Sequence, residues 1–146
     1  MRSVNNMHIK GIHHIAIITS DYLESKRFYT EVLGFAIIAE TYRIERDSYK
    51  LDLSVNGKYQ VELFSFPASR ERASFPEAKG LRHLALEVED IESAVSELNS
   101  KGVEVQAVRV DELTQKKFAF FYDPSGQPLE LYEERPTHPF ENDFIH

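Results

Sequence analysis

Apolar residues recur along the chain with two different periods, and the same order of periods occurs twice. In the first half, the apolar run at 12–18 is short enough to be a strand, and helical spacing follows over 22–33. The runs at 35–43, 49–55 and 58–66 have the composition and length of further strands. The pattern therefore predicts the order β-α-β-β-β for the first half.

The second half predicts the same order of elements. A strand at 81–88 precedes a helix that begins after Asp90, carries apolar residues at i, i+3, i+4 and i+7, and ends at Gly102. Three strands are then expected, at 103–110, 117–122 and 128–133. The chain is thus predicted to consist of two βαβββ modules.

Turn and cap residues mark the ends of these elements. Asn56 and Gly57 both tolerate positive φ, which is typical of a type I′ turn in a tight hairpin. The run Asp-Pro-Ser-Gly at 123–126 places proline at i+1 of a second tight turn. Side chains that can cap a helix N-terminus precede both helices, at Ser20 or Asp21 and at Asp90.

Two motifs repeat between the halves. His14 lies in the stretch GIHHIAIITSD, which returns 69 positions later as GLRHLALEVED and carries His83 there. Glu62 lies in VELF, which returns 68 positions later as LELY and carries Glu130. Each half therefore opens with a histidine on a predicted strand and closes with a glutamate on another.

The repeated histidines and glutamates are predicted to share one face of the sheet. They alternate with aliphatic residues, and the helices need the aliphatic face for packing. The opposite, concave face then holds the histidines and glutamates together with the small residues Ala16 and Ala85. His13 is expected on the helix-facing side, in a structural role.

A carboxylate between aliphatic neighbours is costly unless it is paired, hydrogen-bonded or bound to a metal. Taken singly, each of these residues is typical of an ordinary core or surface position. Their recurrence in both halves favours one shared metal site, formed by His14, Glu62, His83 and Glu130. Two imidazoles and two carboxylates without a thiolate suit a divalent ion such as Ni, Zn, Co, Mn or Fe. A six-coordinate ion would keep two open positions for water or substrate.

Length and charge narrow the class of protein. A chain of 146 residues suits one domain with a real core. Its net charge of −7 gives no reason to expect nucleic acid or an anionic membrane surface as a partner. The absence of cysteine excludes disulfides and thiolate sites. Because no apolar run has the length of a membrane span and the N-terminus lacks a signal-peptide core, a cytoplasmic location is expected. The expected organisation is a leader at 1–10, one domain at 11–134 and a tail at 135–146. Within the domain, modules at 11–66 and 80–134 are joined by a linker at 67–79.

The motifs together resemble the vicinal oxygen chelate superfamily, in particular its glyoxalase I, or lactoylglutathione lyase, branch. The resemblance rests on two H-h-A-h…D stretches, LGF after the first helix, a strand with E-L and a closing DP-G-PLELYE. Small bacterial glyoxalase-like proteins also share the run RVDE-TQK-F, which begins here at Arg109. This resemblance implies an α+β fold in which two βαβββ modules form a cupped eight-stranded mixed sheet around one divalent metal, commonly in a homodimer.

The resemblance also implies a function. His14, Glu62, His83 and Glu130 match the family's metal ligands, and Glu130 matches its candidate general base. The implied activity is that of a metal-dependent lyase or isomerase, acting on a small oxygenated substrate through a metal-stabilised enediolate. Glyoxalase I enzymes often carry an arginine four residues beyond the first ligand, where this chain has Ile18. That difference argues against a glutathione hemithioacetal as the substrate.

Two other functions stay open at this point. An extradiol-type dioxygenase with Fe²⁺ normally uses two histidines and one carboxylate, so the additional Glu62 argues against it. A non-enzymatic protein that sequesters a drug often lacks the metal ligands that this chain has. The basic residues near the predicted strand ends either clamp an anionic substrate or are merely solvated: Arg43, Arg46, Lys50, Arg109, Lys116 and Lys117. The segment 110–118 is a candidate lid.

Overall fold

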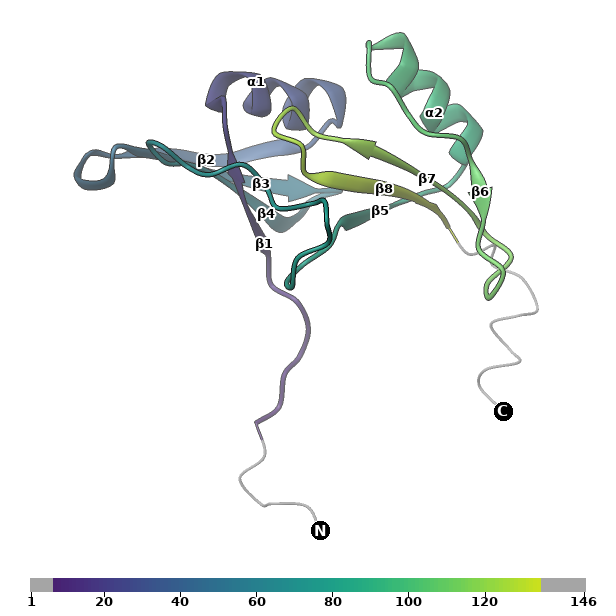
Figure 1. Ribbon diagram of the computed structural model, residues 1–146. Coiled ribbons are helices and arrows are strands. Elements are labelled where there is room, and N and C mark those ends of the chain that lie inside the picture. Colours follow the sequence, from purple (N-terminus) through teal and green to yellow (C-terminus); the bar gives the residue numbers. More distant parts are fainter. Residues whose placement is uncertain (1–6, 135–146) are drawn as a thin grey trace. The chain divides into compact units, whose positions relative to one another are not determined.

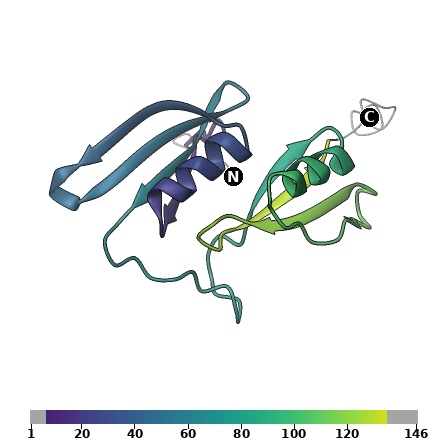
Figure 2. The same ribbon diagram turned by 90° about the horizontal axis from the view of Figure 1, so that it is seen from above.

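The computed structural model describes residues 7–134. The chain divides into two compact units, of which the first ends at Ser69 and the second begins at Arg70. Each unit builds its own four-stranded mixed sheet, with a helix over one face of that sheet (Figures 1 and 2). The predicted α+β class and the repeated βαβββ order are confirmed. The predicted tail at 135–146 lies outside the described residues, as does most of the predicted leader.

The first unit has strand order β1-β4-β3-β2. β1 runs parallel to β4, and the other neighbours are antiparallel. Its elements are β1 (Ile15–Thr19), α1 (Tyr22–Arg27), the π-helical turn η1 (Phe28–Val32), β2 (Ala36–Arg43), the 3-10 turn η2 (Ile44–Arg46), β3 (Ser48–Val55) and β4 (Lys58–Ser65). The helix predicted over 22–33 corresponds to α1 together with η1.

The second unit repeats this topology with strand order β5-β8-β7-β6, again with one parallel pair, β5 and β8. Its elements are β5 (Leu84–Val88), α2 (Ile91–Ser100), β6 (Arg109–Val110), β7 (Lys117–Tyr122) and β8 (Pro128–Glu133). No helix within the described part of the chain has both the length and the hydrophobicity needed to cross a membrane.

The capping and turn residues act as predicted. The Asp21 carboxylate accepts a hydrogen bond from Glu24 N at 3.1 Å, and the Asp90 carboxylate accepts one from Ser93 N at 3.2 Å. Each bond satisfies a backbone N–H of the first helical turn that has no partner within the helix. Asn56 and Gly57 have φ of 51° and 80°, as a type I′ turn requires. The second turn closes with a hydrogen bond of 3.0 Å from Gly126 N to Asp123 O.

Each helix packs on the aliphatic face of its sheet. In the first unit, Tyr22 of α1 stacks on Tyr49 of β3 with 4.4 Å between ring centroids. The large apolar side chains that are fully buried come from the helix-facing positions of the strands and from the helical segments: Tyr29, Leu51, Leu53, Leu63, Ile91, Phe121 and Leu129. The opposite face of each sheet is therefore left for the polar residues of the repeat.

Three strand predictions are corrected. The first strand begins at Ile15 rather than at position 12, and β5 begins at Leu84 rather than at position 81. β1 pairs with β4 only from Val61 onward and β5 pairs with β8 only from Leu129 onward, so the residues before Ile15 and Leu84 join no ladder. Of the strand predicted at 103–110, only Arg109–Val110 forms a ladder with β7. The rest follows β7 as extended chain through one bond, from Gln106 N to Phe120 O at 2.8 Å.

Candidate functional site

The first unit brings His14 and Glu62 together. Their Nε2 and Oε2 atoms lie 3.4 Å apart. His14 immediately precedes β1, and Glu62 lies in β4 directly beside Ala16 in the parallel register. Only 7% of Glu62 is exposed, although it is a carboxylate in the middle of a strand.

The second unit repeats the same geometry with His83 and Glu130. Their Nε2 and Oε1 atoms lie 3.3 Å apart, and Glu130 is also 7% exposed. Glu130 lies beside Ala85 in the register of β5 and β8, as Glu62 lies beside Ala16. Each predicted histidine therefore lies next to the predicted glutamate of its own module.

Glu62 is surrounded by polar groups. Its cross-strand neighbour on β3 is Asp52, and the Tyr59 hydroxyl bonds to both carboxylates, at 3.0 Å to Asp52. Lys50 Nζ lies 2.6 Å from Asp52 Oδ1 and 3.8 Å from Glu62 Oε2. Burial and the hydrogen bonds to the two carboxylates raise the pKa of Tyr59, which therefore stays a neutral donor. The result is a charged network around one side of Glu62.

Glu130 lies in a different environment. Its cross-strand neighbour on β7 is Phe120, whose ring meets the His83 ring edge-on at 5.0 Å. Burial raises the pKa of Glu130, while the nearby His83 and Arg109 oppose this rise. Arg109 lies over the ring of Phe118, 5.1 Å from its centroid, and over Phe120 at 5.8 Å. Glu130 therefore has two aromatic rings and one arginine nearby, whereas Glu62 is surrounded by charged and hydroxyl groups.

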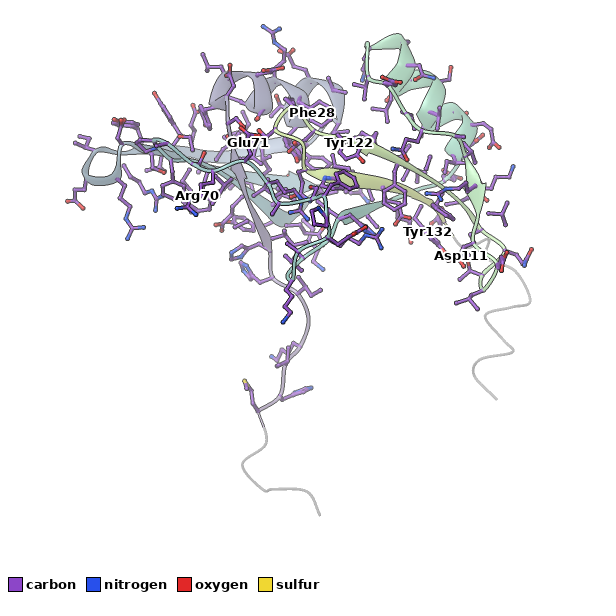
Figure 3. The ribbon with its side chains drawn as sticks, viewed as in Figure 1. Phe28, Arg70, Glu71, Asp111, Tyr122 and Tyr132 are labelled. Atoms are coloured by element: carbon purple, nitrogen blue, oxygen red, sulfur yellow. The ribbon has the colours of Figure 1, made fainter. Side chains whose placement is uncertain are left out.

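The loop at 111–116 is fastened to the sheet beside this second pair. Tyr132, two residues beyond Glu130, donates to Asp111 Oδ2 at 2.7 Å, and its hydroxyl lies 2.6 Å from Thr114 Oγ1 (Figure 3). Asp111 also bonds to Leu113 N at 2.9 Å and, through its carbonyl, to Gln115 N at 2.7 Å. The segment predicted as a candidate lid is therefore tied to β8 in this structure.

Sequence reasoning missed Asp52 and Tyr59. The signal for Asp52 was present, since it stands between Leu51 and Leu53 as Glu62 stands between Val61 and Leu63. Tyr59 had no such signal, because strict alternation from Val61 places it on the aliphatic face. His13 was expected on the helix-facing side, but it is exposed, and its Nδ1 lies 2.8 Å from Nδ1 of His14.

The donor chemistry of both pairs fits a divalent metal. Each pair presents an imidazole nitrogen and a carboxylate oxygen toward one another, and both types of ligand suit borderline divalent ions. Within residues 7–134, no group of three or more His, Cys, Asp and Glu side chains is arranged to hold a metal ion. Each module by itself offers one pair of possible ligands.

Comparison with known proteins agrees with the fold. The chain is 60% identical over 128 residues to the uncharacterized protein YwkD of Bacillus subtilis, a match that covers 88% of this chain and 100% of that protein. The crystal structure of a glyoxalase family protein from Enterococcus faecalis matches with a TM-score of 0.81 and 47% identity, over 87% of this chain and 100% of that one.

More distant relatives have several activities. A lactoylglutathione lyase of Schizosaccharomyces pombe is 26% identical, over 97% of this chain and 53% of that protein. A manganese-dependent 2,3-dihydroxybiphenyl 1,2-dioxygenase of Geobacillus genomosp. 3 is 29% identical, over 86% of this chain and 38% of that protein. The family model of the Glyoxalase/Bleomycin resistance protein/Dioxygenase superfamily matches residues 11–131. The chain therefore belongs to this superfamily, which is also called the vicinal oxygen chelate superfamily.

Proposed function

We propose that this protein is a divalent-metal-dependent lyase or isomerase of the glyoxalase type, which acts on a small oxygenated substrate. The observation that carries this proposal is the matched geometry of the His14–Glu62 and His83–Glu130 pairs, with N–O distances of 3.4 and 3.3 Å. Two nearly equal pairs at equivalent positions of both modules are expected if all these residues hold one ion.

The four residues would hold the ion, and the two glutamates would have different roles. A divalent cation, when bound, acidifies a C–H next to a carbonyl and stabilises the oxyanion that develops. Glu130 would accept the proton from carbon, since burial against Phe120 favours the protonated form of its carboxyl. Glu62 would stay in place, because Tyr59 and Lys50 surround its carboxylate with a donor and a positive charge.

The ion is proposed to be Ni, Zn, Co, Mn or Fe, which the imidazole and carboxylate donors all suit. The manganese dependence named for the Geobacillus dioxygenase supports a metal of this group. Glutathione is not proposed as a cosubstrate. Ile18, which lies beside Phe64 in the register and is 55% exposed, offers no charge to a glutathione carboxylate.

A dioxygenase is the second enzyme class within the same superfamily. Extradiol chemistry needs open positions for both substrate and O₂, which two histidines and one carboxylate provide. Glu62 is as buried as Glu130 and as close to its histidine, so it is proposed as a ligand and counts against this class. A non-enzymatic binding protein is the outcome that remains if the protein holds a ligand but turns none over.

We further propose one domain over 11–134, made of both modules. A homodimer is proposed as its assembly, in a cytoplasmic location. The edge strand β2 supports an oligomer, because it exposes Ile37 and Ile38 at 47% and 52%. Light scattering at micromolar concentration tests this, and a monomer at all concentrations would contradict it.

Elemental analysis of the purified protein tests the metal site. Wild type is expected to hold about one divalent ion per set of four ligands, and Glu62→Ala and His83→Ala are expected to lose most of it. The control is Glu92→Ala, which removes an exposed carboxylate on α2 and should keep the metal. Undiminished metal in both ligand variants would remove the proposed site. A thermal-shift screen of metabolites on the metal-loaded protein then searches for compounds that raise its unfolding temperature, which are candidate substrates.

A further inference from the structure

We propose that Arg109 binds an anionic group of the substrate, a carboxylate or a phosphate, beside the His83–Glu130 pair. This inference rests on the proposed function and names the class of substrate: a small oxygenated acid or phosphate ester whose adjacent oxygens face the metal ligands. Arg109 opens the run RVDE-TQK-F, which the proposed metal chemistry does not use.

The position of Arg109 connects it to the second His–Glu pair. Arg109 pairs with Phe118 across β6 and β7, and its guanidinium lies over Phe118 and Phe120. Phe120 in turn is the register neighbour of Glu130 and contacts the His83 ring edge-on at 5.0 Å. Phe120 thus contacts both the guanidinium and the His83 ring, and it neighbours Glu130 in the ladder.

The guanidinium of Arg109 has no partner of opposite charge within residues 7–134. Three other basic side chains of this unit do have partners: Lys117 pairs with Glu92 at 2.7 Å, Lys101 pairs with Glu97 at 3.6 Å, and Arg72 donates to two backbone carbonyls. Acidic residues outnumber basic ones by 24 to 17 in this chain, so partners for arginine are plentiful. An arginine held on two rings and left without a carboxylate keeps its donors available for a ligand.

The geometry of this arginine suits an anion. Stacking on aromatic faces restricts the side chain before a ligand arrives, which lowers the entropy lost on binding. A planar guanidinium donates two parallel hydrogen bonds to a carboxylate or a phosphate. The loop at 111–116 follows β6 directly, and its bonds to Tyr132 hold the end of that short strand in place. The loop thus fixes the strand from which Arg109 projects.

The competing explanation is charge compensation. In that case Arg109 only offsets the nearby carboxylates Glu130 and Asp111, and no anion binds to it. The two explanations differ in what happens when an anion is added, and this difference does not require a known substrate.

The experiment titrates the full chain with glycolate and, separately, with inorganic phosphate. Binding is followed through the arginine Nε–H signals in NMR spectra. The spectra are recorded on protein loaded with Zn²⁺, which is diamagnetic, and on metal-free protein. The Arg109 signal is expected to shift with at least one anion. Arg109→Met should weaken that anion's binding by roughly tenfold or more, and Arg109→Lys should restore only part of it. Hydroxyacetone, which offers adjacent oxygens without charge, should bind wild type and Arg109→Met equally.

Lys117→Met is the matched control. It removes the same charge from β7, but its side chain pairs with Glu92 on the opposite face of the sheet, so anion binding should not change. Equal anion binding by wild type and Arg109→Met, or no binding of either anion at millimolar concentration, would overturn the proposal. Metal content is measured in the same samples. Equal anion binding by wild type and Arg109→Met, when both retain metal, contradicts only the role of Arg109. Wild-type protein that holds no metal contradicts the proposed function, and the titration of metal-free protein still tests Arg109.

Discussion

The Tyr59 hydroxyl donates a hydrogen bond to the carboxylate of Glu62. The equivalent glutamate of the second module, Glu130, lies beside the Phe120 ring instead. If Glu62 is a permanent metal ligand, Tyr59 fixes the orientation of its carboxylate through Oε2, the oxygen that also faces His14, as outer hydrogen-bond partners of metal ligands do.

Tyr59→Phe is therefore expected to weaken divalent metal binding by about 10–100-fold, which is the usual cost of losing such a partner. Isothermal titration with Zn²⁺ measures this directly. Tyr122→Phe, at the end of β7 and 40% exposed, is the control and should bind metal like wild type. Equal affinities in all three proteins would show that Tyr59 does not position Glu62.

The two glutamates are expected to respond differently to removal of their charge. Glutamine keeps an oxygen ligand but is no base, so Glu130→Gln should retain much of its metal and lose activity by about 10²–10⁴-fold. Glu62→Gln should lose less activity. Turnover of a substrate found by screening, measured with metal content in parallel, checks this. The assignment is reversed if Glu62→Gln is the inactive variant while Glu130→Gln stays active.

Asp111 should make stability depend on pH at the acid end. The hydrogen bond from Tyr132 lowers the pKa of Asp111 in the folded protein. A carboxyl with a lowered pKa stabilises the fold above its unfolded pKa, about 3.9, and loses this contribution as pH falls through the folded value. The thermal midpoint of wild type should therefore fall more steeply below about pH 4 than that of Asp111→Asn. Parallel curves for the two proteins would contradict this prediction.

Substitution of Leu63, in the core, should destabilise the fold strongly. It is fully buried on β4, so Leu63→Ala is expected to lower the free energy of unfolding by about 2–5 kcal/mol. Leu23, on α1 and 73% exposed, provides the matched substitution, and Leu23→Ala should have little effect. Denaturant titration measures the free energy of unfolding of both variants. A similar decrease in the two variants would mean that burial of the leucine does not determine the cost of its substitution.

The sequence predicted the strands that carry the glutamates, because period-two alternation and tight turns are local signals. It also predicted that each glutamate has a histidine at an equivalent place, because the repeat preserves both positions. The starts of β1 and β5 were misplaced, since pairing begins only at Val61 and Leu129 on the partner strands. Where a ladder begins depends on the partner strand, and an apolar run does not contain that information.

Tyr59 was missed for a more specific reason. The register between β3 and β4 shifts between Leu53, which pairs with Val61, and Ser54, which pairs with Tyr59. This bulge at Gln60 turns Tyr59 to the face that holds Glu62. Arg109 illustrates the same limit, since its contact with Phe118 and Phe120 depends on the pairing of β6 with β7.

Asp52 and Phe120 occupy the same register position, one beside Glu62 and the other beside Glu130. The two halves repeat one sequence motif, whereas the roles proposed for Glu62 and Glu130 require surroundings that differ. The change between an acid and a phenyl ring at this one position is enough to make the modules no longer interchangeable. A chain assembled from two copies of the first module would surround both glutamates with the same side chains, and it would lose the proposed distinction between a glutamate that holds the metal and one that exchanges a proton.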